Sequence, residues 1–218
     1  MKHLLSLYDC TKEEIESILE LAIKLKADNK AGRTHHLLKG KSLGMIFSKS
    51  STRTRVSFEV GMYQLGGQAL FLSPRDLQIG RGEPLEDTAR VLSRYLDGIM
   101  IRTFAQKEVE DLAEYGSIPI INGLTDYCHP CQVLADLMTI REFKGQFNGL
   151  KMCFIGDGNN MAHSLAHACA MAGIDCYIAT PEKYKCMPDQ IEKAKAMTQN
   201  SKIVETTDPE EAMKNADI

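Results

Sequence analysis

The sequence predicts an α/β protein made of two doubly wound parallel-sheet domains, the second of them incomplete. Short apolar runs of strand length alternate with longer stretches of helical periodicity along the whole chain. Such alternation predicts parallel strands joined by helices that cover the sheet. The pattern pauses at a polar, glycine-containing segment, residues 144–149, and then begins again. We therefore predict a first domain at residues 1–145 and the start of a second at residues 146–218.

The first domain opens with a helix that we expect after Thr11. Thr11 suits an N-cap, and Glu13 and Glu14 favour the first helical turn. Apolar residues then recur every three or four positions and stop before Asn29 and Gly32. The other elements expected in this domain are strands at residues 43–47, 69–72, 99–101 and 118–121, and helices at residues 52–65, after Pro84, at 106–115 and from Pro130 to about Phe143.

The second domain repeats the alternation of strands and helices. We expect strands at residues 151–155, 175–179 and 202–205, and helices at residues 161–172, about 188–199 and 208–216. Three strands make a thin parallel sheet whose open edge would normally be paired. The pattern stops at Ile218 where a further strand is due, so we expect the chain to be truncated within this domain.

Composition gives no reason to expect nucleic acid or a membrane as partner. The formal net charge is −3 and the pI is near 6.1, so an anionic ligand must be held by a local cluster of cations. No apolar run approaches the roughly 18 residues that span a bilayer. Residues 1–14 lack the features of a secretory or transit peptide, and the seven cysteines are scattered. These features predict a reduced, cytoplasmic protein.

The segment from Phe47 to Arg55 follows a buried apolar run and opens a predicted helix. A helix start offers free backbone N–H groups and the positive end of the helix dipole, a combination that binds anions. Three hydroxyls and two guanidiniums within residues 51–55 add donors suited to a phosphoryl group. The alternative interpretation is a serine-capped helix with solvated arginines. A Walker loop is excluded because His35 stands where the glycine five residues before Gly40 would be required.

Four motifs, in this order along the chain, resemble those of the aspartate/ornithine carbamoyltransferase family. They are Ser51-Thr52-Arg53-Thr54-Arg55, Asp97-Gly98-Ile99-Met100-Ile101-Arg102, His129-Pro130-Cys131-Gln132 and Gly156-Asp157-Gly158-Asn159-Asn160. The resemblance runs from about residue 3 to the end of the chain. Lys49 stands where aspartate-specific members typically carry proline, so the chain is more similar to the ornithine branch.

This resemblance implies transfer of the carbamoyl group of carbamoyl phosphate to the δ-amine of L-ornithine, giving L-citrulline and phosphate in arginine biosynthesis. The resemblance assigns four residues to the phosphate: Ser51, Thr52, Arg53 and Thr54. It assigns the catalytic residues Thr54, Arg102 and His129 to the carbonyl oxygen. It assigns Gln132 to the carbamoyl amide and Asn160 to ornithine. Negative charge develops on that carbonyl oxygen in the transition state, so donors there favour reaction. No metal or organic cofactor is needed.

Gln78 matches a position from which family members reach the phosphate across a subunit interface, which implies a homotrimer or a multiple of trimers. Two alternatives stay open. The acceptor could be putrescine or another amine, or the chain could be a non-catalytic module that binds carbamoyl phosphate. Two family segments, Asp-x-x-x-Ser-Met-Gly and His-Cys-Leu-Pro, do not occur before Ile218. We therefore expect this chain to show little turnover.

Three other signals receive a simpler interpretation. Cys128 and Cys131 form a C-x-x-C pair before a helix, which can indicate a redox site, but the family motifs explain this segment better. His163 and His167 are spaced to chelate a metal, yet no third ligand is evident, and we expect solvated or core-edge side chains. The turn at residues 156–161 lacks the third glycine of a dinucleotide fingerprint, since Met161 occupies it.

Overall fold

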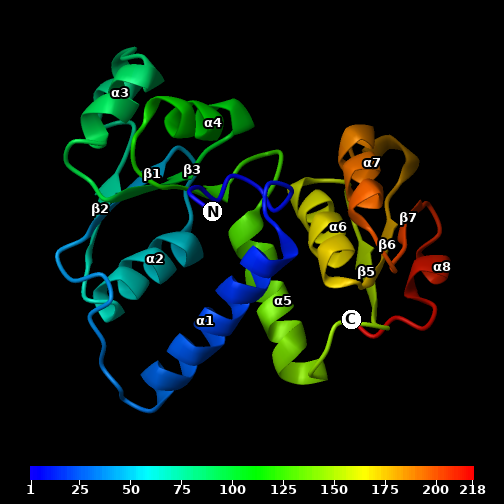
Figure 1. The fold of residues 1–218 in the computed structure, drawn as a ribbon. Coiled ribbons are helices and arrows are strands. Elements are labelled where there is room, and N and C mark those ends of the chain that lie inside the picture. The colour runs from blue at the N-terminus through cyan, green and yellow to red at the C-terminus, as the bar shows by residue number, and fades with distance from the viewer. The chain divides into compact units, whose positions relative to one another are not determined.

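The computed structural model describes residues 1–79 and 81–218, which form two compact units (Figure 1). Unit 1 comprises Met1–Leu5 and Lys24–Asp126, and unit 2 comprises Ser6–Ile23 and Tyr127–Ile218. Each unit contains one parallel sheet with helices, so the predicted α/β class is confirmed. Because helix α1 (Lys12–Lys30) contributes to both units, this spatial division does not mark one boundary along the sequence. The boundary expected near residue 145 stays a prediction.

Unit 1 contains a four-stranded parallel sheet in the order β2-β1-β3-β4. Its strands are β1 (Ser42–Phe47), β2 (Gln68–Leu72), β3 (Gly98–Arg102) and β4 (Ile120–Leu124). Helix α2 (Thr52–Gln64) lies on one face, and α3 (Leu85–Leu92) and α4 (Gln106–Tyr115) lie on the other (Figure 1). A short 3-10 helix, η1 (Gln78–Arg81), follows β2. Both faces of the two central strands are covered, which explains why those strands are continuous apolar runs.

Strand β4 begins two residues later than we predicted and ends three residues later. Pro119 precedes it and has no N–H to donate to a ladder, although its carbonyl accepts from Ile99 at 2.9 Å. The polar residue Asn122 nevertheless belongs to the strand and is fully buried. Its side-chain amide donates to Leu5 O at 2.8 Å, so burial leaves that donor satisfied. The predicted strand ended before this first polar residue, so the prediction of its end was wrong.

Unit 2 contains a three-stranded parallel sheet in the order β5-β6-β7. Its strands are β5 (Lys151–Ile155), β6 (Asp175–Ala179) and β7 (Ile203–Thr206), and its other elements are α5 (Pro130–Lys144), α6 (Asn160–Ala172), η2 (Glu182–Tyr184), α7 (Pro188–Met197) and α8 (Pro209–Met213). Helices α6 and α7 pack side by side, and α8 lies on the opposite face of the sheet (Figure 1). The residues of α6 from Ala162 to Ala170 are all buried, so this helix forms the core of the unit.

The end of the chain lies along the free edge of β5. Cys153 N–H donates to Ile218 O at 2.9 Å, and Asp217 N–H donates to Lys151 O at 2.9 Å. Helix α8 is shorter than the predicted 208–216 and is followed by Asn215, whose φ of 58° is left-handed and incompatible with a continuing helix. In residues 1–79 and 81–218, no helix combines the length and the apolar character that crossing a bilayer requires.

Candidate functional site

The first group of candidate residues lies where the winding of the unit 1 sheet reverses. Strands β1 and β3 are neighbours, and Phe47 at the end of β1 is in register with Arg102 at the end of β3. The chain leaves β1 toward β2 on one side, and β3 lies on the other. In doubly wound sheets, ligands bind outside the carboxyl ends of strands at such a reversal. The segment after Phe47 is held there, because Ser48 N–H donates to Arg102 O at 2.9 Å.

Helix α2 begins at this reversal with the hydroxyl-rich motif. Ser51 is its N-cap, in an extended conformation, and its Oγ accepts from Thr54 N–H at 3.1 Å. The first turn contains no acidic residue that would neutralise the positive end of the helix dipole. Thr52 and Arg53 are exposed, and Ser51 and Thr54 are half-buried. The structure therefore brings the four phosphate-site candidates together on one helical turn.

Arg102 reaches the same helix start from the end of β3. Its Nη1 lies 3.4 Å from Thr54 Oγ1, a long hydrogen bond that leaves capacity for another acceptor. Its Nε is buried and has no hydrogen-bond partner in the part of the chain that the structure describes. Burial lowers the pKa of Arg102 from its usual value, but a guanidinium remains charged in proteins. The result is a partly desolvated cation with unused donors.

A pocket of about 590 Å³ opens beside this helix start. Its lining comes from the end of β1, the first turns of α2 and the segment after β2, and consists of Phe47, Ser48, Ser50, Ser51, Thr52, Arg55, Val56, Phe71, Ser73, Pro74 and Arg75. The guanidinium carbon of Arg55 lies 3.7 Å from the centroid of the Phe71 ring. Arg55 also pairs with Glu59, with 3.0 Å between Nε and Oε1, so its position is set by its own neighbours.

Two further basic or polar candidates lie apart from these contacts. Lys49 is paired with Asp126, and its Nζ lies 4.4 Å from the centroid of the Phe104 ring. These contacts hold Lys49 against Asp126 and Phe104. Gln78 is the first residue of η1, is exposed, and is not among the residues that line the pocket beside α2.

The second group of candidates belongs to unit 2. His129 is the N-cap of α5, and Pro130 occupies the first helical position, where its missing N–H costs nothing. Gln132 is exposed one turn later and donates to Asp136 Oδ1 at 2.9 Å. Asn160 is the first residue of α6, which is capped by Asn159 through a 2.9 Å bond from Met161 N–H.

Within this group a buried serine connects His129 and Asn160. The backbone N–H of His129 donates to Ser164 Oγ at 2.8 Å, and Ser164 Oγ–H donates to Asn160 O at 2.7 Å. Sequence reasoning missed Ser164. A serine inside a predicted helix four residues after a candidate ligand was the available signal, because such hydroxyls often bond to the carbonyl four residues earlier.

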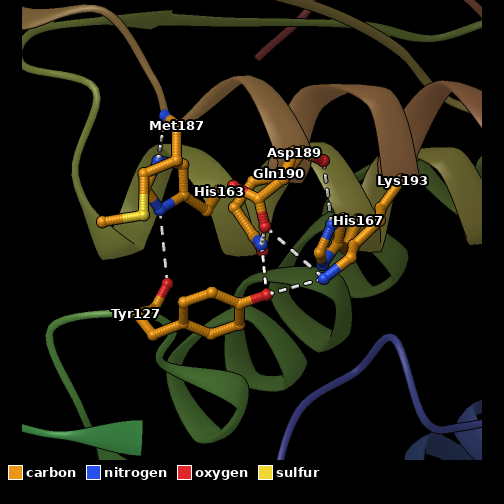
Figure 2. Close-up of polar contacts among 7 residues, drawn as sticks. All are labelled: Tyr127, His163, His167, Met187, Asp189, Gln190 and Lys193. Atoms are coloured by element: carbon orange, nitrogen blue, oxygen red, sulfur yellow. Dashed lines mark hydrogen bonds and ion pairs between the residues drawn. The ribbon is translucent and has the colours of Figure 1, made fainter.

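The two histidines of α6 are buried, at 1% and 2% exposure, so of the two environments that we expected, solvated or core-edge, the solvated one is wrong. Figure 2 shows their contacts. His163 bonds to Tyr127 O and to Met187 N–H, and His167 Nε2 lies 3.1 Å from Gln190 O. Burial lowers the pKa of both imidazoles, which favours their neutral forms. Across residues 1–79 and 81–218, no three His, Cys, Asp or Glu side chains gather as a metal ion would require.

The remaining motif signals are also explained by packing. Burial raises the pKa of the Cys131 thiol to about 12, the opposite of what a reactive redox cysteine needs. Gly158 packs against the main chain of the loop before α7, since a Cβ there would lie 2.2 Å from Cys186 N. The chain itself thus occupies the space that a pyrophosphate would approach in a dinucleotide fingerprint.

Two family models together match nearly the whole chain. The aspartate/ornithine carbamoyltransferase carbamoyl-P binding domain matches residues 2–142, and the Asp/Orn binding domain of the same family matches residues 148–218. The chain belongs to the aspartate/ornithine carbamoyltransferase family. It is therefore a member of a family of carbamoyltransferase enzymes.

Individual members of this family are similar over the full length of the chain. An ornithine carbamoyltransferase of Pelobacter propionicus is 56% identical, with 100% of this chain and 71% of that protein covered. One from Syntrophotalea carbinolica is 57% identical with the same coverage. The structure of ornithine carbamoyltransferase from Pyrococcus furiosus matches with a TM-score of 0.97 at 52% identity, covering 99% of this chain and 70% of that one.

Proposed function

We propose that this carbamoyltransferase transfers the carbamoyl group of carbamoyl phosphate to the δ-amine of L-ornithine, giving L-citrulline and phosphate. The observation that carries the proposal is the 56–57% identity over the whole chain to proteins named ornithine carbamoyltransferase. The geometry of unit 1 supports it, because a capped helix start and a partly desolvated arginine meet at the reversal of the sheet.

The start of α2 is the proposed phosphate site. Its free backbone N–H groups and helix dipole favour a dianion, and Ser51, Thr52 and Thr54 add hydroxyl donors. Arg53 is exposed and can supply a bidentate pair of N–H donors to phosphate oxygens. A net charge of −3 for the whole chain makes this local cluster necessary, since the global field does not attract an anion.

Arg102 and Thr54 are proposed to donate to the carbonyl oxygen of the carbamoyl group. As the ornithine amine attacks the carbamoyl carbon, that oxygen gains negative charge until the bond to phosphate breaks. For unit 2 we assign His129 to the same oxygen, Gln132 to the carbamoyl amide and Asn160 to ornithine. The attacking amine has a pKa near that of lysine, about 10.4, so the bound form must lose a proton before attack.

We further propose a homotrimer, or a multiple of trimers, that works in the cytoplasm in arginine biosynthesis. The exposed position of Gln78, away from the residues lining the pocket beside α2, suits a role toward a neighbouring subunit. Light scattering on the purified protein should give three times the mass of one chain, or a multiple of that mass. Mixing Gln78→Ala subunits with Arg53→Ala subunits should then restore activity in the hybrid if sites are shared, and no recovery would contradict a shared site.

The test of the reaction is citrulline formation and phosphate release from carbamoyl phosphate, with ornithine, putrescine and aspartate as separate acceptors, at a protein concentration high enough to detect the low turnover that we expect of this chain. Citrulline with ornithine and no product with the other amines is the expected result. Turnover with putrescine but not with ornithine would show that putrescine, and not ornithine, is the acceptor. Calorimetric binding of carbamoyl phosphate without turnover on any amine would instead support the non-catalytic module.

A further inference from the structure

Two adjacent residues of α6 hold the main chain on either side of Cys128. His163 Nδ1 bonds to Tyr127 O at 3.3 Å, and Ser164 Oγ accepts from His129 N–H at 2.8 Å. Figure 2 shows the first of these contacts, in which the imidazole points from α6 toward the Tyr127 carbonyl. The short segment that leads into α5 is thus attached to α6 at two successive points.

The contact from His163 requires one tautomer of the imidazole. Met187 N–H donates to His163 Nε2 at 3.1 Å, so this nitrogen must accept and carries no hydrogen. The hydrogen therefore lies on Nδ1 and is donated to Tyr127 O. The Tyr127 hydroxyl is fixed as well, by Gln190 Nε2 and by Lys193 Nζ at 3.0 Å (Figure 2).

The hydroxyl of Ser164 both accepts and donates a hydrogen bond. It accepts from His129 and donates to Asn160 O at 2.7 Å, and only 2% of the residue is exposed. Each of these bonds is within normal hydrogen-bond length. The peptide group that carries His129 is therefore held at a fixed spacing from the main chain of Asn160 by a single buried oxygen.

We propose that Ser164 is a positioning residue that fixes His129 relative to Asn160. The proposal rests on the proposed function, in which His129 contacts the carbamoyl group and Asn160 contacts ornithine. His129 lies at a helix N-cap with φ −135° and ψ 72°, outside both helix and strand geometry, so the helix alone does not set its orientation. A misplacement of about 1 Å at a reacting group can cost roughly 10²-fold in rate.

Unit 1 contains a matched control for this serine. Ser93 Oγ donates to Ala89 O, four residues earlier, at 2.7 Å and accepts from Ser117 N–H at 3.1 Å. This is the same pattern of bonds at a helix, and neither partner is a candidate ligand. Ser93→Ala thus removes an equivalent hydroxyl without touching a residue that we assign to substrate.

The test compares Ser164→Ala with Ser93→Ala in two measurements. Hydrogen exchange followed by NMR should show faster exchange of the His129 amide in Ser164→Ala and an unchanged rate in Ser93→Ala. Steady-state kinetics with carbamoyl phosphate and ornithine should show kcat lowered by roughly 10- to 100-fold in Ser164→Ala and by less than about 2-fold in Ser93→Ala. Thermal melting checks that both variants are folded.

Ser164→Thr keeps the hydroxyl and should recover the protection of the His129 amide and most of kcat. Unchanged His129 exchange in Ser164→Ala would overturn the contact. Faster exchange with the kinetics of Ser93→Ala would overturn the positioning role. If the unaltered protein binds no carbamoyl phosphate and shows no turnover, the proposed function fails, while the exchange measurement still decides whether Ser164 holds the His129 peptide.

Discussion

Arg102 Nη1 lies 3.4 Å from Thr54 Oγ1, although 48 positions separate the two residues along the chain. The contact arises because β1 and β3 are neighbours in the sheet, with Phe47 in register with Arg102. Thr54 follows β1 within the first turn of α2, and Arg102 is the last residue of β3. The topology of the sheet thus places a helix start and a strand end at one point.

The first prediction is that Arg102 and Thr54 act together on the same ligand. Arg102→Gln should lower kcat by roughly 10²- to 10³-fold, because it removes a charged donor from the developing oxyanion. Thr54→Val removes the hydroxyl but keeps the side-chain shape. In a double-mutant cycle on kcat/KM, the two changes should couple by about 0.5–3 kcal/mol. Purely additive effects would contradict a shared role.

The second prediction concerns the charge on the first turn of α2. Arg53→Ala should weaken carbamoyl phosphate binding by about 1.5–3 kcal/mol, since hydrogen bonds to charged groups contribute that much. Calorimetry at two salt concentrations measures the effect. Arg90→Ala is the control, because Arg90 is an exposed arginine of α3 that pairs with Asp87. If Arg53→Ala binds carbamoyl phosphate with the same affinity as Arg90→Ala, Arg53 does not contact the phosphate.

Much of the fold follows from patterns that are local in sequence. The alternation of apolar runs and helical periodicity predicted the parallel sheets, because both faces of a parallel strand are buried. The helix start at Ser51 was likewise predictable, since its cap and its donors lie within five residues. These predictions succeed because they depend on interactions between residues that are close together in the sequence.

Other features depend on partners that are distant along the chain. Asn122 belongs to β4 because Leu5 satisfies its amide, more than a hundred residues away. The burial of His163 depends on Tyr127 and Met187, which come from two other segments. Ser164 can bond to the His129 amide only because α5 begins beside α6. No local pattern in the sequence indicates such contacts. The predicted strand therefore ended before Asn122, the expectation for His163 included a solvated side chain, and Ser164 was not identified.

The third prediction is that Cys131 reacts slowly with thiol reagents. With its pKa raised to about 12 by burial, the thiolate fraction at pH 8 is on the order of 10⁻⁴. Alkylation by iodoacetamide, followed by mass spectrometry, should therefore be far slower in the native protein than in urea. Equal rates in the two states, or a reversible disulfide between Cys128 and Cys131 under mild oxidant, would restore the redox interpretation.

The fourth prediction is a loss of stability below neutral pH that comes from the buried histidines. Burial is the main cause that lowers the pKa of His163 and His167 in the folded protein, with Lys193 adding to the shift of His167, and Asp189 opposing both. The unfolded chain therefore binds protons at higher pH than the folded one. The stabilisation is complete above about pH 6.5 and is lost as pH falls through that value toward the lowered folded pKa values.

Each histidine can change the free energy of unfolding by at most about 1.4 kcal/mol per pH unit in this window. His167→Gln keeps an N–H that can donate to Gln190 O but does not titrate, so it should flatten the slope between pH 5.5 and 7. His36→Gln replaces an exposed histidine of unit 1 and is the control for the substitution itself. Urea unfolding followed by circular dichroism at each pH measures these slopes. A slope for His167→Gln equal to that of the unaltered protein would show that His167 is not a source of the acid sensitivity.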